Sequence, residues 1–396
     1  MTFRTNTATR AVRAAIESDT QHGAVVPPLH LSSNFAFAGF GAKRQYDYTR
    51  SGNPTRDALA GALAELEGGA GATVTSSGMA ALTLLLQLLQ PGDVLIAPHD
   101  CYGGTYRLFE HLAAKGHFEV LFVDQTDIGA VDAAGERKPK MILTETPSNP
   151  LLRIVDIAAM SKIAKRSGAL FAVDNTFLSP ALQQPIALGA DIVIHSTTKY
   201  INGHSDVVGG AVIAATNELD EQLKWWANCL GIAGAPFDSY LTLRGLRTLH
   251  TRIRQHEESA TVLAHVLDQQ TTVNRVYYPG LERHPGHRIA MRQQSGFGGM
   301  VSFEIDGGEA AVRAFVEHLE HFSLAESLGG VESLVCHPAS MTHAPVSDAA
   351  LAQAGIGNNL IRLSVGLEST EDLVADILAG LEVASGADTV KPVVAA

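Results

Sequence analysis

Between about residues 60 and 215, short apolar runs alternate with longer amphipathic runs along the chain. Val, Ile, Leu and Phe dominate the apolar runs, as in strands that are buried on both faces of a sheet. Strands that alternate with helices favour a mainly parallel sheet covered by helices on both faces, so we predict an α/β fold. The predicted strands lie within ATVTSS (72–77), DVLIAPH (93–99), FEVLFVD (118–124), KMILTETP (140–147), ALFAVDNT (169–176) and ADIVIHST (190–197).

Two of the intervening stretches carry clear helix signals. Residues 79–90 (MAALTLLLQLLQ) are predicted to form a helix that ends at Pro91 and Gly92. Within DIAAMSKIAKRSG, a second helix is predicted to begin after Asp156 as its N-cap and to end at Gly168. Both helices fit the alternation of an α/β domain.

The two ends of the chain differ from this central region. The first fifty residues are rich in turn formers and lack sustained periodicity, which indicates an arm that lies on another surface. After about residue 250, strand-like and helix-like runs follow each other without strict alternation, which favours a smaller α+β unit. We therefore predict an arm (1–58), a main α/β domain (59–250) and an α+β domain (251–396) with a loose tail after Gly386.

Charge and cysteine content exclude several classes of protein. With 29 basic and 41 acidic residues the net charge is −12, which disfavours a nucleic-acid or membrane-surface partner. The longest apolar run, near 82–89, is too short to span a bilayer, and the first residues have no signal-peptide core. Cys101, Cys229 and Cys336 are widely spaced and form neither a disulfide nor a zinc pattern. We expect a cytoplasmic protein without a metal.

Polar side chains follow several of the predicted strands at the point where each strand ends. Tyr102, Asn149, Asp174 and Lys199 each lie just beyond such a strand. The carboxyl ends of parallel strands meet at one edge of a sheet, where ligands bind, so we expect these side chains to converge. The strand that runs into residues 76–79 turns there into a helix, and the free N–H groups of a helix start bind anions such as phosphate.

An aromatic ring, an amide, a carboxylate and an amine beside an anion site match the requirements of pyridoxal phosphate (PLP). Lys199 can bind the cofactor aldehyde covalently, Asp174 can pair with the ring nitrogen, and Tyr102 can stack on the ring. Taken singly, an Asp at a strand end is commonly a loop cap and a lysine is commonly solvated, so the interpretation rests on the joint arrangement. The other predicted cofactor contacts, including those to the phosphate, are Ser77, Gly78, Met79, Asn149, Ser196 and Thr198.

The chain resembles a known family in the segments that carry these residues. SSGMAA, TETPSNPL, VDNTF and HSTTKYINGHSDVVGG stand where the fold-type I, γ-class PLP enzymes of cysteine and methionine metabolism carry them. The resemblance extends to YDYTRSGNPTRDALAGALAELEGG, FDSYLTLRGLRTL and AESLGGVESL and covers about residues 5–385. It implies a fold-type I transferase with a seven-stranded sheet, PLP as cofactor, and a homotetramer built from dimers that share active sites.

The same resemblance implies roles for residues that the strand pattern leaves open. Tyr48 and Arg50 look like the pair that reaches from a neighbouring subunit to the cofactor phosphate, although the residues alone would suit a charged turn. Arg362, with Ser327, is expected to bind a substrate carboxylate; on sequence alone a surface ion pair is the alternative. Arg107 is expected to bind a carboxylate at the distal end of the substrate. Glu326 is expected to attract the ammonium group of the incoming substrate. For both residues the alternative is a surface ion pair.

The implied reaction takes place at Cγ of an amino acid. We favour γ-replacement, in which the sulfur of cysteine displaces the acyloxy group from Cγ of an O-acylated homoserine (succinyl is our first choice), so that cystathionine forms and the acyloxy group leaves as a carboxylate. The alternative is γ-elimination, which converts cystathionine into cysteine, 2-oxobutanoate and ammonia. Two other classes of protein, an oxidoreductase and a non-catalytic scaffold, are disfavoured. GAGATV imitates part of a dinucleotide-binding motif but precedes its strand, which argues against an oxidoreductase. A non-catalytic scaffold would not need the full set of cofactor residues.

Overall fold

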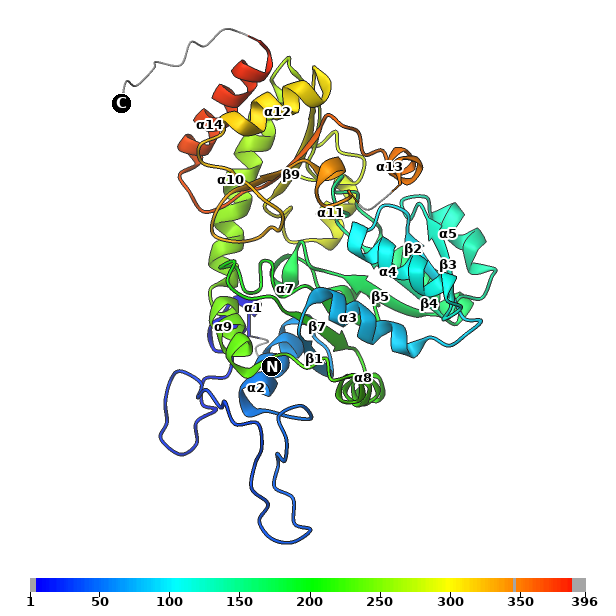
Figure 1. The fold of residues 1–396 in the computed structure, drawn as a ribbon, viewed down its shortest axis with the longest axis vertical. Coiled ribbons are helices and arrows are strands. Elements are labelled where there is room, and N and C mark those ends of the chain that lie inside the picture. The colour runs from blue at the N-terminus through cyan, green and yellow to red at the C-terminus, as the bar shows by residue number, and fades with distance from the viewer. Residues whose placement is uncertain (1–4, 345–346, 387–396) are drawn as a thin grey trace.

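A seven-stranded sheet forms the centre of the molecule in the computed structural model, which describes residues 5–344 and 347–386 (Figure 1). The strands are β1 (Gly71–Thr75), β2 (Val94–Pro98), β3 (Glu119–Val123), β4 (Met141–Glu145), β5 (Leu170–Asp174), β6 (Ile192–His195) and β7 (Gly210–Ala214). Their order is β1-β7-β6-β5-β4-β2-β3, and β7 alone runs antiparallel to its neighbours. The predicted α/β fold with a mainly parallel sheet is confirmed.

Both faces of this sheet are buried, because successive residues of each strand enter different cores. Leu143 of β4 packs in the cluster that contains α3, whereas its neighbour Ile142 packs in the cluster that contains α6. The helices of this region are α2 (Pro54–Glu67), α3 (Gly78–Leu85), α4 (Gly103–Ala114), α5 (Ile128–Gly135), α6 (Ile157–Ser167), α7 (Ser179–Leu182), α8 (Asn217–Leu230) and α9 (Pro236–Leu246), with 3₁₀ turns at Leu86–Leu88 and Pro185–Leu188. Burial on both faces explains why the strands read as continuous apolar runs.

One of the two predicted helices is confirmed and the other is shorter than expected. In α6, Asp156 accepts a hydrogen bond from the N–H of Ala159, and Gly168 ends the helix with φ of 72°. The predicted helix over 79–90 instead ends at Leu85 and continues as a 3₁₀ turn. The leucines of this stretch pack into one core on several sides, and the side chain of Gln87 donates to the carbonyl of Thr83, so tertiary packing replaces the last helical turn.

A five-stranded sheet and its helices form the second unit, in the upper part of Figure 1. The strands are β8 (Val273–Tyr277), β9 (Met300–Ile305), β10 (Ser323–Leu324), β11 (Leu334–Cys336) and β12 (Leu360–Ser364), in the order β10-β11-β12-β9-β8. The helices are α10 (Leu249–Asp268), α11 (His287–Gln293), α12 (Gly308–His318), α13 (Asp348–Ala354) and α14 (Thr370–Ala384), with a 3₁₀ turn at Pro338–Ser340. Residues of α10, α12 and α14 pack on one face of this sheet, where Ile361 and Leu363 join their core. Arg362 and Ser364 therefore face away from that core.

The arm begins with a short helix, α1 (Thr7–Val12), which packs on α2 and α10. Residues 13–53 then form long loops that extend from the body of the molecule (Figure 1). The predicted part boundaries at 58 and 250 fall inside α2 and α10, which begin at Pro54 and Leu249. The predicted loose tail lies outside the described residues. Among the described residues, no helix is long and apolar enough to cross a membrane.

Candidate active site

A cavity of about 390 Å³ lies at the carboxyl edge of the large sheet, where that sheet meets the second unit. It brings together most of the residues that the sequence predicts for the site. Those among its lining are Ser77, Gly78, Met79, Tyr102, Asn149, Asp174, Ser196, Thr198, Lys199, Glu326, Ser327 and Arg362. Tyr48, Arg50 and Arg107 are not part of the lining in this single chain.

Lys199 lies in the turn that follows β6, and its Nζ donates a hydrogen bond of 2.7 Å to Oγ of Ser327. Burial, followed by the positive charge of Arg362, lowers the pKa of Lys199 to about 8, against a smaller opposing effect of Glu326. An amine with this pKa is neutral in a much larger fraction near neutral pH than an exposed lysine. Lys199 is therefore suited both to covalent bonding with an aldehyde and to proton transfer.

Asp174 and Glu145 end the neighbouring strands β5 and β4 and are paired in register. Burial raises the pKa of Asp174, while hydrogen bonds from Thr176, one of them 3.0 Å from its N–H, act in the opposite direction. Burial and then the nearby Asp174 raise the pKa of Glu145 well above its usual range. Two adjacent acidic groups in one cavity favour a cationic ligand, and the protonated ring nitrogen of PLP fits beside Asp174.

Sequence reasoning missed Glu145. The available signal was a single carboxylate at the end of an otherwise buried apolar strand, one strand away from Asp174. An exposed loop acid would look the same in the sequence. Only the strand order, with β4 beside β5, shows that the two carboxyl groups share a wall of the cavity.

The start of α3 forms the anion-binding side of the cavity. Oγ of Ser77 caps the helix by accepting from the N–H of Ala80 at 3.0 Å, and the N–H groups of Gly78 and Met79 belong to the first, open turn. A Cβ at position 78 would lie 2.8 Å from Cβ of Ser196, so only glycine permits this close approach. Oγ1 of Thr198 is fixed by exchanging hydrogen bonds with the backbone of Gly209. N–H groups and hydroxyls of this kind suit a phosphate.

Arg362 closes the cavity from the second unit. Its side chain is buried, so the alternative of a surface ion pair is wrong. Its Nη1 donates to Oδ1 of Asn149 at 2.7 Å, and its Nη2 donates to the carbonyl of Ser327 at 3.0 Å. Among the described residues its buried Nε has no hydrogen-bond partner. Ser327 has φ of 91°, a left-handed backbone conformation. The guanidinium is thus held in place with donor capacity left for a carboxylate.

Tyr102 and Arg107 both belong to the start of α4 but point to different surroundings. Tyr102 is the N-cap residue, half-exposed at the cavity, and its N–H donates to Oε2 of Glu145 at 3.1 Å. Arg107 is exposed and is not part of the cavity lining. Its predicted role in acyl recognition stays a prediction.

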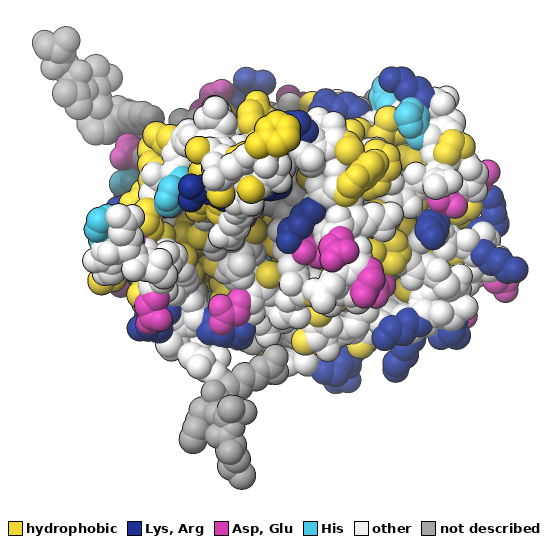
Figure 2. Space-filling model, turned by 90° about the horizontal axis from the view of Figure 1, so that it is seen from below, with side chains coloured by type: hydrophobic (Ala, Val, Ile, Leu, Met, Phe, Trp, Pro, Cys, Tyr) yellow, Lys and Arg dark blue, Asp and Glu magenta, His cyan; other side chains and the backbone are white. Residues whose placement is uncertain are grey.

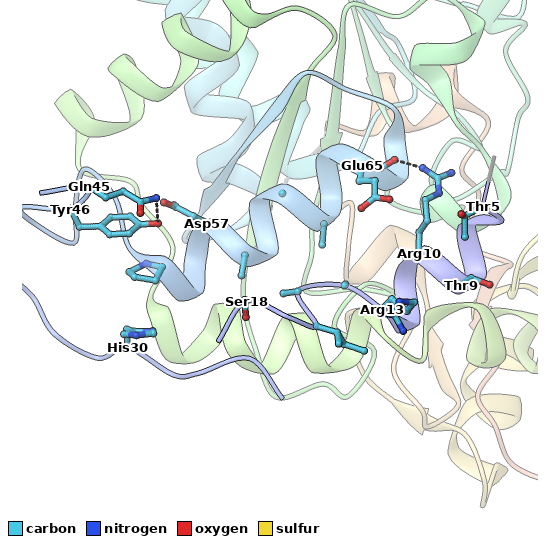
Figure 3. Close-up of a pocket in the computed structure, with 17 residues that line it drawn as sticks. Thr5, Thr9, Arg10, Arg13, Ser18, His30, Gln45, Tyr46, Asp57 and Glu65 are labelled. Carbon is cyan, nitrogen blue, oxygen red and sulfur yellow. Dashed lines mark hydrogen bonds between the residues drawn. The ribbon is translucent and has the colours of Figure 1, made fainter. Parts of the chain in front are cut away.

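Tyr48 and Arg50 lie on the arm, away from the cavity of their own chain. Nη1 of Arg50 donates to the carbonyl and to Oδ1 of Asn228, at 2.6 and 2.7 Å. A wider cavity of about 1170 Å³ lies between the arm, α1 and α2 (Figure 3). There Arg10 donates to the carbonyl of Glu65 and the side chain of Gln45 donates to Tyr46. This second cavity contains none of the predicted cofactor residues, so the chemistry belongs to the first.

Lys199 follows β6, and Asp174 ends the neighbouring strand β5. The start of α3, which can bind a phosphate, lines the same cavity. This arrangement defines a fold-type I PLP-dependent enzyme. A family model described as "Cys/Met metabolism PLP-dependent enzyme" matches residues 8–382. The chain belongs to this family, and its cofactor is PLP.

Individual relatives agree with this assignment. The chain is 55% identical to the cystathionine gamma-synthase of Escherichia coli, over 96% of this chain and 98% of the relative. It is 47% identical to a cystathionine beta-lyase of Lactococcus lactis, over 96% and 99% of the two chains. The crystal structure of cystathionine gamma synthase from Xanthomonas oryzae pv. oryzae in complex with cystathionine superposes with a TM-score of 0.96, at 62% identity and over 97% and 100% of the chains. A dinucleotide-dependent oxidoreductase and a non-catalytic scaffold are therefore ruled out.

Proposed function

We propose that this enzyme makes cystathionine by γ-replacement, joining cysteine to an O-acylated homoserine with succinyl as the acyl group. The observation that carries the proposal is the buried Arg362, whose guanidinium lies beside Lys199 with a donor left unpaired among the described residues. A buried cation next to a reactive amine suits a substrate that carries both an α-carboxylate and an α-amine. The synthases of Escherichia coli and Xanthomonas oryzae, at 55% and 62% identity, support the choice of reaction.

The proposed roles divide the chemistry among a few side chains. When bound, PLP supplies an electron sink for the bond that breaks at Cα. Asp174 keeps the ring nitrogen protonated, and Tyr102 stacks on the ring. Lys199 anchors the cofactor between turnovers and then carries protons at Cα and Cβ of the substrate. The remaining proposed cofactor contacts are Ser77, Gly78, Met79, Asn149, Ser196 and Thr198.

Three further residues are proposed to recognise the substrates. Arg362, held by Ser327 and Asn149, binds the α-carboxylate. Glu326 lines the cavity and attracts the ammonium group of the incoming cysteine. Arg107 is proposed to bind the distal carboxylate of a succinyl group, which requires its side chain to turn toward the cavity mouth.

We further propose a homotetramer in which Tyr48 and Arg50 of one subunit complete the site of its neighbour. The support is the arm itself, whose exposed large apolar side chains include Val25, Val26, Leu31, Phe37 and Phe40. Contiguous apolar surface marks an interaction site, so we propose that these side chains contribute to the subunit interface. Seen from below, the molecule shows yellow hydrophobic side chains between charged ones (Figure 2). The three free cysteines agree with a reducing cytoplasm as the location.

The second candidate function is γ-elimination of cystathionine, as in a cystathionine γ-lyase. A specific finding supports it, since the crystal structure of a cystathionine gamma-lyase from Lactobacillus plantarum superposes with a TM-score of 0.93 at 40% identity, over 96% of this chain and 100% of that chain. Steady-state kinetics decide between the two. We expect the kcat/KM for O-succinylhomoserine in the presence of cysteine to exceed that for cystathionine alone. Faster release of 2-oxobutanoate from cystathionine than formation of cystathionine would replace the first proposal by the second.

A further inference from the structure

Glu145 is a buried acid at the wall of the active-site cavity, with no role in the chemistry proposed above. It is the last residue of β4, only 8% exposed, and it lines the cavity beside Asp174. A buried carboxyl group costs stability unless it is well paired. The hydrogen bonds of Glu145 therefore indicate its function.

Glu145 uses both of its oxygens to hold backbone groups from two different segments. Oε2 accepts from the N–H of Tyr102 at 3.1 Å, at the start of α4. Oε1 accepts from the N–H of Asn149 at 2.9 Å, in the loop after β4. One carboxyl group thus connects two walls of the cavity.

Each of the two segments carries a different part of the proposed site. Tyr102 supplies the ring that stacks on the cofactor. Asn149 supplies Oδ1, which accepts from Nη1 of Arg362 at 2.7 Å. The contacts run from the aromatic wall through Glu145 and Asn149 to the guanidinium that binds the substrate.

We propose that Glu145 is a positioning residue that fixes the stacking ring of Tyr102 and the carboxylate-binding group of Arg362 relative to each other. The inference rests on the roles proposed for those two residues. It does not depend on whether the reaction ends in replacement or in elimination.

The chemistry of the two contacts explains why a carboxyl group is required at this position. Both partners are N–H donors, and the carboxyl group accepts from them with its two oxygens. A glutamine has one oxygen and one NH2 group, so one of the two backbone N–H groups would face another donor. An aspartate keeps the two oxygens of the carboxyl group but is shorter by one methylene, so its carboxyl group does not reach both N–H groups.

The test uses the Glu145→Gln holoenzyme and two readouts that do not require turnover. The first is the equilibrium dissociation constant for glycine, taken from the change in the cofactor absorption band, compared with that for ethylamine, which has no carboxylate. We expect binding of glycine to weaken about ten-fold, the scale of one hydrogen bond to a charged group, and binding of ethylamine to stay within about two-fold. The second readout is the circular dichroism of the cofactor band, which should change because Tyr102 is displaced.

Glu119→Gln is the matched control, because Glu119 begins β3, the edge strand two places from β4 in the same sheet, and has an exposed side chain paired with Arg137. This variant should behave as wild type. If Glu145→Gln does not yield folded holoenzyme, Glu145→Asp decides by the same two readouts and should lose glycine affinity in the same way.

Glycine affinity and cofactor dichroism equal to those of the control, in whichever variant folds, would overturn the proposal. So would an equal loss for glycine and ethylamine, because Glu145 would then act on the cofactor alone. If the proposed γ-replacement itself were wrong, the kinetics of the wild-type enzyme would show it, because 2-oxobutanoate would be released from cystathionine faster than cystathionine is formed.

Discussion

The active-site cavity and the N-terminal arm differ in where their side chains find partners. In the cavity, Lys199, Arg362 and Glu145 are each hydrogen-bonded to groups of the same chain. On the arm, Phe40 is fully exposed and Tyr48 is half-exposed. The fold of one chain therefore determines the cavity, whereas the function proposed for the arm requires a second copy. Substitutions in the cavity should act on their own subunit, and substitutions in the arm should act on the neighbour.

The largest effect is expected at the centre of the cavity. Lys199→Ala should lower turnover by about 10³-fold or more, the scale on which loss of a catalytic nucleophile acts. The phosphate contacts come from other elements, so the variant should still retain some cofactor. Borohydride reduction of wild-type holoenzyme followed by peptide mapping should place the pyridoxyl group on Lys199, and a label on another lysine would refute the assignment.

Asp174→Asn should have the next largest effect. An amide lacks the charge that keeps the ring nitrogen protonated, so exchange of the substrate Cα proton should slow by about 10²-fold, as when other charge-stabilising groups are removed. Substrate binding should change far less. Exchange measured by NMR in D2O gives the first quantity and spectral titration the second. Asp132→Asn, at an exposed position on α5, is the control. Near-normal exchange in Asp174→Asn would remove Asp174 from this role.

Mixing two inactive variants tests the contrast between cavity and arm directly. Lys199→Ala and Arg50→Ala should each be inactive alone. If the site is shared, random exchange of subunits in an equal mixture should restore about a quarter of the wild-type activity, because half of the dimers are mixed and one of their two sites carries neither defect. Subunit exchange is verified with a mass-tagged copy. Exchange without any recovered activity means that Arg50 does not serve the neighbouring site.

A smaller effect is expected at Arg107, which belongs to α4 but lies outside the cavity lining. Arg107→Ala should raise the KM for O-succinylhomoserine by about ten-fold through loss of one charged contact, and it should leave the KM for O-acetylhomoserine nearly unchanged. Equal changes for the two substrates would exclude Arg107 from acyl recognition.

The smallest effect concerns the titration of Lys199 in the apoenzyme. Its reaction with acetic anhydride, followed by mass spectrometry as a function of pH, should have a midpoint near the lowered pKa of about 8 rather than at the ordinary 10.5. Glu326 raises this pKa by stabilising the ammonium form, so Glu326→Gln should move the midpoint to lower pH. A midpoint near the ordinary value would show that Lys199 is solvated in the apoenzyme.

Much of the large sheet could be predicted from the sequence, because each strand is short, apolar and followed by polar residues. The predicted strand over 169–176 contains β5, and Asp174 ends that strand at the cavity as expected. The same reasoning missed β7, which lies outside the six predicted strands, and it could not give the antiparallel direction of that strand, because periodicity within a strand carries no information about its neighbours. The sequence also did not predict that α3 ends at Leu85, because tertiary packing and not helix propensity ends this helix.

The site was predictable where one residue type suits one chemical task, and less so where a role depends on distant contacts. Lys199 and Asp174 could be selected in this way. Glu145 could not, because its function lies in two backbone N–H groups that the sequence does not place near it. The sequence likewise could not show that Arg107 lies outside the cavity lining, because this depends on how α4 packs on the rest of the fold.

At position 327, the residue that would make the fold more stable is not the residue that best positions the amine of Lys199. Its left-handed backbone, with φ of 91°, costs a residue other than glycine of the order of 1 to 3 kcal/mol. Glycine would adopt this conformation freely, but it has no hydroxyl to accept the hydrogen bond from Nζ of Lys199. Selection for heat resistance alone would thus favour glycine here, whereas selection for turnover would retain serine.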